Sequence, residues 1–259
     1  MPFANLEDVK IHYEWTGAEH LPVLVFSNCL GTNLRMWDPQ IESFSKHYRI
    51  LRYDTRGLGQ SGVTPGPYTI EQLSWDVVHV LDTLKLDRVY FCGLSMGGMT
   101  GMFLGANAAN RFHKLVLCNT AAKIGTAETW NARIQAVQSG GMKAVASSVI
   151  ERWLTPSFRA SHAAEAQSLR EMLESANAQG YVANCAAVRD LDQRDSLGKI
   201  RAPCLVVTGT HDPATTPVDA HFLTKSIPSA AYVELSASHL SNFEARDDFN
   251  RQVLQFLLA

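Results

Sequence analysis

One stretch of the 259-residue chain decides its fold: Val89-Tyr90-Phe91-Cys92-Gly93-Leu94-Ser95-Met96-Gly97-Gly98. An apolar run of β-branched and aromatic residues ends there in the pattern G-x-S-x-G, and small and apolar residues continue from Met99 to Ala109. This order is typical of a buried strand, a sharp turn and a helix. The glycines leave space where a Cβ would clash with the strand or the helix. We therefore expect the Ser95 hydroxyl at the carboxyl edge of a sheet, in front of a helix N-terminus.

The motif is short, and a plain glycine-rich connection between a strand and a helix is the alternative to a nucleophilic serine. The strand before the turn and the helix after it favour the nucleophile. A serine hydroxyl is a poor nucleophile at neutral pH, so it needs a general base and an acid that orients this base. Such partners are expected at the ends of later strands.

Strands and helices alternate around this motif. The expected strands cover residues 9–15, 22–27, 48–53, 89–94, 115–118, 204–209 and 231–235. The expected helices cover residues 36–44, 69–86, 99–109 and 247–258, and Thr69 is a candidate N-cap. This order predicts an α/β fold with a mostly parallel central sheet, right-handed crossovers and helices on both faces.

Residues 123–189 interrupt the alternation. They contain no convincing strand, and their alanine-rich helical segments break at Gly140-Gly141, Pro156 and Gly180. We interpret them as a helical cap inserted over the carboxyl edge of the sheet. The core then consists of residues 1–122 and 190–259.

The composition is that of an ordinary globular protein, with 46% hydrophobic residues, 19% charged residues and a net charge of −2. It gives no reason to expect nucleic acid or a membrane as a partner. The five cysteines are scattered without metal-binding spacing, which favours free thiols and a reducing, cytoplasmic location. We find no signal-peptide pattern at the start of the sequence and no apolar run of transmembrane length.

Asp212 and His239 are the expected partners of Ser95, because each directly follows one of the last two strands. The chain order serine, acid, histidine suits a sheet of this kind. An aspartate that only caps its loop beside Pro213 is the alternative for Asp212.

Two other residues compete for these roles. His211 also lies at a strand end, but no later carboxylate is placed to orient it. Asp54 precedes the serine in a glycine-rich loop, where we expect it to organise the loop together with Arg56.

The motifs GLSMGG around Ser95, YDTRGLGQS from Tyr53, GTHD from Gly209 and ASH ending at His239 resemble those of the α/β-hydrolase superfamily. The resemblance covers essentially the whole chain. A closer resemblance to the 3-oxoadipate enol-lactonase family lies in the segments SNCLGTNLRMW, GPYTIEQL and CNTAAKIGT. It implies a hydrolase of bacterial aromatic catabolism that opens a lactone ring in the β-ketoadipate pathway without a metal or an organic cofactor.

Two backbone N–H groups are expected to hold the oxyanion of such a reaction. One belongs to Met96, the residue after the nucleophile, and the other to the loop after the strand at 22–27. Where the superfamily usually has His-Gly-x, this chain has Asn28-Cys29-Leu30, so we expect the Leu30 N–H to be the second donor.

The implied substrate carries an acetate arm, and burying this carboxylate without a cation would be costly. Trp130 and Arg133 lie three residues apart in a predicted helix, so they share a face. Arg133 is our candidate for binding the carboxylate, with Trp130 as a wall for the ring. Arg152 and Trp153 are a second candidate pair.

Other functions remain open at this point. The same serine and partners suit a carboxylesterase, a perhydrolase or a carbon–carbon bond hydrolase. A small-molecule receptor that keeps the fold without turnover is a further alternative. The oligomeric state is also open, and a homo-oligomer is one possibility. Haloalkane dehalogenases and epoxide hydrolases are disfavoured, because they use an aspartate where Ser95 stands.

Overall fold

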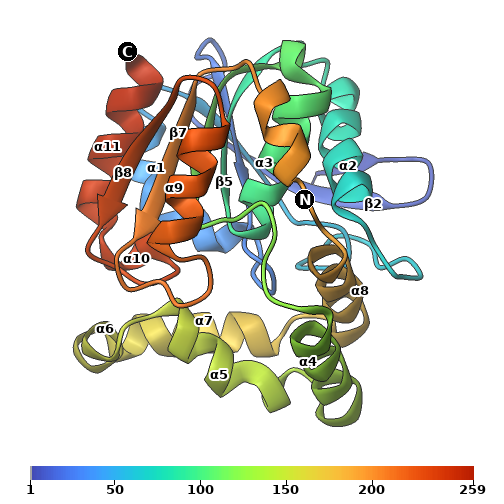
Figure 1. The fold of residues 1–259 in the computed structure, drawn as a ribbon. Coiled ribbons are helices and arrows are strands. Elements are labelled where there is room, and N and C mark those ends of the chain that lie inside the picture. The colour runs from blue at the N-terminus through green and yellow to red at the C-terminus, as the bar shows by residue number, and fades with distance from the viewer. Residues whose placement is uncertain (1) are drawn as a thin grey trace.

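A central sheet of eight strands organises the molecule, and the computed structural model describes residues 2–259 (Figure 1). The strand order is β1-β2-β4-β3-β5-β6-β7-β8. The strands are β1 (Phe3–Asn5), β2 (Lys10–Thr16), β3 (Val23–Ser27), β4 (Arg49–Tyr53), β5 (Val89–Leu94), β6 (Phe112–Cys118), β7 (Cys204–Gly209) and β8 (Ala230–Leu235). Only the pairings of β1 with β2 and of β2 with β4 are antiparallel. The predicted mostly parallel sheet is therefore confirmed.

Helices cover both faces of this sheet (Figure 1). On one face α1 packs against α11, and on the other α2 packs against α3, while α9 lies on β7 and β8. These helices are α1 (Asp38–Phe44), α2 (Ile70–Thr83), α3 (Met96–Asn107), α9 (Pro217–Ser226) and α11 (Arg246–Leu258). The four-residue helix α10 (Ser241–Glu244) precedes α11, and the 3-10 helices are η1 (Leu34–Trp37), η2 (Ala109–Arg111) and η3 (Arg194–Lys199).

Local sequence signals explain most of these boundaries. Thr69 accepts a hydrogen bond from the Gln72 N–H at 3.0 Å, which confirms it as the N-cap of α2. Every residue of β7 is buried, and this accounts for its continuous apolar run. Several boundaries differ from the sequence prediction: β6 begins at Phe112, three residues earlier than expected, and α2 ends at Thr83 instead of residue 86. The three-residue edge strand β1 was missed because it is too short to show alternation, and α3 begins at Met96, three residues earlier than expected.

Five α-helices and the 3-10 helix η3 lie between β6 and β7, and no strand lies between Cys118 and Cys204. The α-helices are α4 (Ala127–Gly140), α5 (Lys143–Trp153), α6 (Pro156–Ser161), α7 (Ala163–Glu174) and α8 (Ala178–Arg189). We call residues 127–189 the helical segment. Figure 1 shows it as one group of helices below the carboxyl ends of β7 and β8. The proposed boundaries of a core and a cap stay predictions. Within residues 2–259, no helix has both the length and the apolarity that crossing a membrane requires.

Candidate active site

Ser95 lies in the turn between β5 and α3 in a strained conformation. Its φ is +57°, a left-handed value that is unfavourable for a residue with a Cβ. Two hydrogen bonds hold this geometry: the Ser95 N–H donates to the Cys118 carbonyl at 2.8 Å, and the Thr120 hydroxyl donates to the Ser95 carbonyl at 2.8 Å. The neighbouring strand β6 thus supports the turn that presents the serine.

Close backbone packing explains the two glycines of the motif. A Cβ on Gly93 would lie 2.2 Å from the Gly97 carbonyl oxygen, and a Cβ on Gly97 would lie 2.2 Å from the Ser27 carbonyl oxygen. Because these neighbours are backbone atoms, a side chain could be accommodated only by moving β3, β5 or α3.

We expect Gly97→Ala to destabilise the fold so strongly that little folded, active protein is obtained, because the added Cβ would clash with the backbone of β3. Soluble yield and the thermal unfolding temperature measure this effect. Gly198→Ala is the matched control, since a Cβ at Gly198 meets no atom within 4 Å. A Gly97→Ala variant with unchanged stability would contradict this account of the turn.

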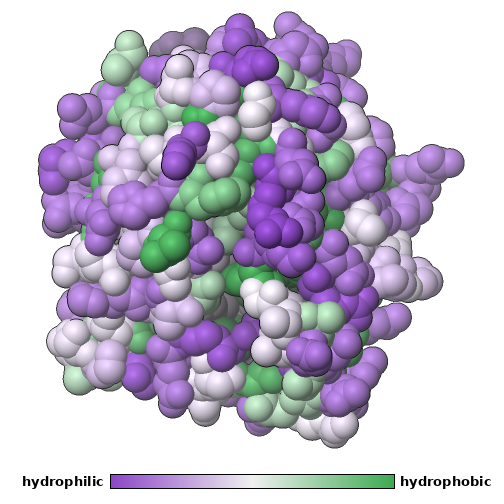
Figure 2. Space-filling view, viewed as in Figure 1, coloured by the Kyte–Doolittle hydropathy of each residue, from purple (hydrophilic) through white to green (hydrophobic). Residues whose placement is uncertain are grey.

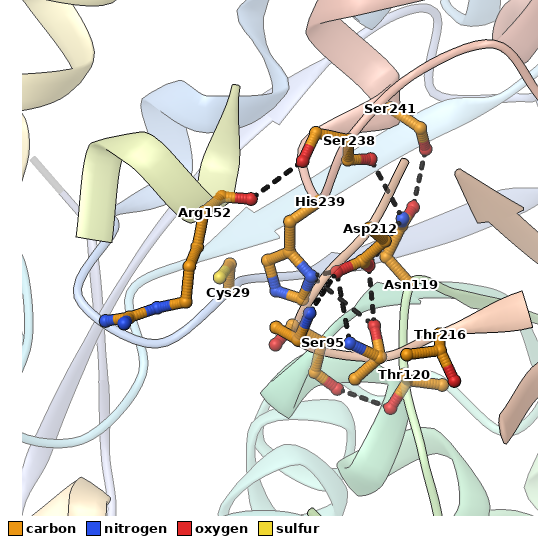
Figure 3. A network of polar contacts seen from close by, with 12 residues as sticks. Cys29, Ser95, Asn119, Thr120, Arg152, Asp212, Thr216, Ser238, His239 and Ser241 are labelled. Atoms are coloured by element: carbon orange, nitrogen blue, oxygen red, sulfur yellow. Dashed lines mark hydrogen bonds and ion pairs between the residues drawn. The ribbon is translucent and has the colours of Figure 1, made fainter. Parts of the chain in front are cut away.

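Asp212 and His239 form a buried pair next to this turn (Figure 3). Asp212 lies in the loop after β7 and His239 in the loop after β8, and the His239 Nδ1 lies 2.8 Å from the Asp212 Oδ2. Since Nδ1 faces the carboxylate, Nε2 is the nitrogen left to act as a base.

Four further donors hold the Asp212 carboxylate in place. They are the Asn119 side-chain amide at 3.0 Å, the Thr215 hydroxyl at 2.7 Å, and the backbone N–H groups of Ala214 at 2.8 Å and Thr215 at 3.0 Å. Asn119 is fully buried with a positive φ of +44°, and its side-chain oxygen accepts a hydrogen bond from the Ser241 hydroxyl at 2.6 Å. Neither Asn119 nor Thr215 was predicted from the sequence. The available signal was the place of Asn119, directly after a strand.

The electrostatics of the pair favour an ionised Asp212. Burial raises the pKa of this carboxyl, but the charge of His239 and the hydrogen bonds from His239, Asn119 and Thr215 outweigh burial and lower the pKa to about 2. Burial lowers the pKa of His239, but the Asp212 carboxylate outweighs it and raises the pKa to about 10. Raising the pH therefore increases the fraction of His239 that is neutral and able to accept a proton.

Ser95 and His239 both line one cavity of about 320 Å³. Leu30 contributes to its wall from the loop after β3, and Trp130, Arg133 and Trp153 contribute from the helical segment. Figure 2 shows a hollow in the surface near the middle of the molecule, between the sheet and the helical segment. The structure thus brings side chains of the sheet's loops and of the helical segment, predicted as site residues from the sequence, to one cavity.

Two backbone donors are available beside Ser95. The N–H groups of Leu30 and Met96 are buried and have no hydrogen-bond acceptor among residues 2–259. By contrast, the Cys29 N–H donates to the Met36 sulfur at 3.1 Å, and the Gly97 N–H donates to the Asn28 carbonyl at 2.9 Å. Leu30 and Met96 therefore offer the free donors that an oxyanion requires.

The competing residues lie elsewhere. His211 lines a different cavity from Ser95, and its backbone N–H donates to the Ala237 carbonyl. The Asp54 carboxylate accepts hydrogen bonds from the backbone N–H groups of Leu34 and Gln60. These bonds agree with the expectation that Asp54 organises its loop. Arg56 pairs with Asp76 at 2.7 Å and with Asp8 at 2.6 Å. In the part of the chain that the structure describes, no three His, Cys, Asp or Glu side chains form a cluster that could hold a metal ion.

A mostly parallel sheet with Ser95 in the turn after β5, and with Asp212 and His239 after the last two strands, defines an α/β hydrolase. Residues 22–245 match the family model of the alpha/beta hydrolase fold.

Two relatives from Acinetobacter baylyi indicate a narrower family within this fold. The chain is 42% identical to 3-oxoadipate enol-lactonase 2 over 247 residues, and 38% identical to 3-oxoadipate enol-lactonase 1 over 245 residues. Each alignment covers 95% of this chain and 92% of the relative.

A solved structure agrees with these relatives. The enol-lactonase from Burkholderia xenovorans LB400 superposes with a TM-score of 0.98 at 45% sequence identity, and 100% of each chain is covered. The chain belongs to the 3-oxoadipate enol-lactonase family of α/β hydrolases.

Proposed function

We propose that this protein is a serine hydrolase that opens the lactone ring of 3-oxoadipate enol-lactone to give 3-oxoadipate, in the β-ketoadipate pathway of bacterial aromatic catabolism. The observation that carries the proposal is the cavity that Ser95 and His239 share, with His239 held by Asp212. The similarity to relatives named 3-oxoadipate enol-lactonase supports the choice of substrate. A small-molecule partner follows from this activity, while a cytoplasmic location and a homo-oligomer stay predictions.

The proposed reaction begins with attack of the Ser95 hydroxyl oxygen on the lactone carbonyl. The Nε2 of His239 takes the serine proton, and the Asp212 carboxylate holds the Nδ1–H and stabilises the imidazolium that forms. The Leu30 and Met96 N–H groups are placed to bind the oxyanion of the tetrahedral intermediate.

Collapse of this intermediate breaks the ring carbon–oxygen bond, and the His239 imidazolium gives its proton to the leaving ring oxygen. The resulting enol remains attached through the acyl chain and tautomerises to a ketone. The acyl-enzyme is an ester of Ser95. His239 then removes a proton from water, the water attacks the ester carbonyl, and Ser95 regains its proton as 3-oxoadipate leaves. These steps need only side chains and backbone N–H groups of this protein and one water molecule, so we expect no metal or organic cofactor.

The helical segment supplies the proposed recognition of the acetate arm. The Arg133 guanidinium lies 4.6 Å from the centre of the Trp130 ring, and both residues line the cavity. Trp153, from α5, lines the same cavity. Arg133 can form charge-assisted hydrogen bonds to the carboxylate while the two tryptophans enclose the apolar faces of the ring.

We expect Arg133→Ala to raise the KM for the enol-lactone by about 10- to 100-fold with a smaller change in kcat, because a charge-assisted hydrogen bond contributes roughly 1.5–3 kcal/mol. Steady-state kinetics measure this. Arg170→Ala is the matched control, since Arg170 lies on α7 and pairs with Glu174. An unchanged KM for Arg133→Ala would remove Arg133 from the site.

A further inference from the structure

One side chain, Glu244 on α10, joins two parts of the molecule that lie far apart in the sequence. Its half-buried carboxylate accepts hydrogen bonds on both oxygens. The Oε2 accepts the N–H of Ser238, the residue before His239. The Oε1 accepts the N–H of Thr155 at 2.9 Å and the Thr155 hydroxyl at 2.6 Å. Because Thr155 is the N-cap of α6, the carboxylate connects the helical segment to the loop that carries the base.

The other polar groups of Ser238 are also bound. Its carbonyl accepts a hydrogen bond from the Asn119 side-chain amide at 3.2 Å, and its hydroxyl donates to the Arg152 carbonyl at 2.8 Å (Figure 3). Asn119 is the same residue that donates to the Asp212 carboxylate. Three neighbours therefore hold the residue before the base, and one of them also holds the acid.

The residue on the other side of His239 is bound to the same helix end. Leu240 donates its backbone N–H to the Trp153 carbonyl at 2.9 Å. Arg152 and Trp153 are the last two residues of α5, so both neighbours of the base are bonded to the helical segment. A displacement of this segment would therefore move the imidazole of His239 relative to Ser95, and an error of about 1 Å in such a geometry can lower the rate about 100-fold.

The chemistry of the Glu244 carboxylate matches this arrangement. A carboxylate has acceptors only, so it can satisfy donors from two directions at the same time. Hydrogen bonds from N–H groups to a charged oxygen are also stronger than those to a neutral one. A glutamine amide at this position would turn an N–H group toward one of the two sides and break the connection there.

We propose that Glu244 is a positioning residue of the catalytic reaction, which fixes His239 relative to Ser95 by tying the loop after β8 to the start of α6. Glu244 lines a different cavity from Ser95, so it acts through Ser238 and not through contact with the substrate. This inference rests on the proposed function for the serine and its base, and not for the choice of the lactone as substrate.

Steady-state kinetics of Glu244→Gln test this role. We expect kcat for the enol-lactone to fall about 10- to 100-fold while KM changes less than about 3-fold, because the geometry of the base matters in the transition state and not for substrate binding. Glu165→Gln is the matched control. Glu165 on α7 pairs with Arg246 of α11 at 2.8 Å, so it also joins the helical segment to another part of the chain, but without a contact to the base loop.

A second measurement needs no lactone. Diisopropyl fluorophosphate forms a bond between its phosphorus and the oxygen of an activated serine, while fluoride leaves and the base takes the serine proton. The first-order rate constant of fluoride release does not depend on how much of the protein is folded, so a loss of stability alone leaves it unchanged. We expect Glu244→Gln to lower this constant about 10-fold or more and Glu165→Gln to leave it unchanged.

Substitutions of Thr155 test the other end of the connection, and they provide the test if Glu244→Gln does not fold. Thr155→Asp keeps an N-cap acceptor for the Phe158 N–H, but it places a second carboxylate against Glu244. It should slow fluoride release by a factor similar to that of Glu244→Gln. Thr155→Ser keeps the hydroxyl donor and should restore the rate that Thr155→Asp loses.

The inference is overturned if Glu244→Gln and Thr155→Asp react with the reagent as fast as the wild type, or if Glu165→Gln slows the reaction as much as they do. A wild type that does not react at all would overturn the activated serine and this inference together. The fate of the lactonase proposal is separate. An effect of Glu244 on fluoride release would support the positioning role even if the wild type did not open the enol-lactone.

Discussion

Replacing Ser95 with alanine is expected to reduce the turnover of 3-oxoadipate enol-lactone by roughly 10⁴-fold or more, since removal of a triad nucleophile has effects of this size. The proposed reaction passes through a covalent acyl-enzyme, which cannot form without the serine hydroxyl. Only the cavity and the two N–H donors would then still assist a direct attack by water. The loss of ultraviolet absorbance by freshly generated lactone measures both variants under the same conditions.

The control for this experiment is another buried serine. Ser74 is fully buried in α2, its hydroxyl donates to the Ile70 carbonyl, and it does not line the cavity that Ser95 and His239 share. We expect Ser74→Ala to keep most of the activity. A Ser95→Ala protein that folds and retains a tenth of the wild-type rate would exclude Ser95 as the nucleophile.

Wild-type protein that folds but does not turn over the lactone would remove the lactonase proposal. The same buried pair and serine would then be tested with neutral esters and with substrates of carbon–carbon bond hydrolases. Stoichiometric ligand binding without any turnover would favour a receptor instead.

The second large effect is expected for Asp212→Asn, which should lower kcat/KM by roughly 10⁴-fold. The Nδ1 of His239 lies 2.8 Å from the Asp212 carboxylate, which accepts its proton. An asparagine amide can instead donate to Nδ1, which leaves the proton on Nε2, so the nitrogen facing the serine can no longer accept one.

The same substitution should also shift the pH dependence. Two opposing effects act on the pKa of His239: burial lowers it, and the Asp212 carboxylate outweighs burial and raises it to about 10. Without that charge, burial dominates and the pKa falls. The acidic limb of kcat/KM against pH should therefore move to lower pH, although the maximum is much smaller.

Kinetics between about pH 5 and about pH 10 measure this shift, because the limb reports the ionisation of the essential base. Asp219→Asn is the matched control, since the Asp219 carboxylate caps α9 by accepting hydrogen bonds from Thr216. A limb that moves to higher pH in Asp212→Asn would contradict the assignment of Asp212 as the partner of His239.

Much of the architecture was predictable because it depends on local patterns. Continuous apolar runs marked β3, β5 and β7, since strands buried on both faces exclude polar side chains. The motif at Ser95 was equally local, because the strained turn leaves no room for a Cβ at Gly93 or Gly97. Asp212 and His239 could be named because chemistry in such sheets gathers at the carboxyl ends of strands.

Sequence alone thus determined the fold class, the serine turn and the two strand-end partners, since periodicity and chain order report which faces are buried and where strands end. Only the tertiary structure decided what supports them. Asn119 reaches Asp212 across 93 positions in the chain, and three helices bring Arg133, Arg152 and Tyr181 to one cavity. No local sequence pattern predicts such long-range contacts, because they depend on how helices and loops pack against each other after the strands have formed.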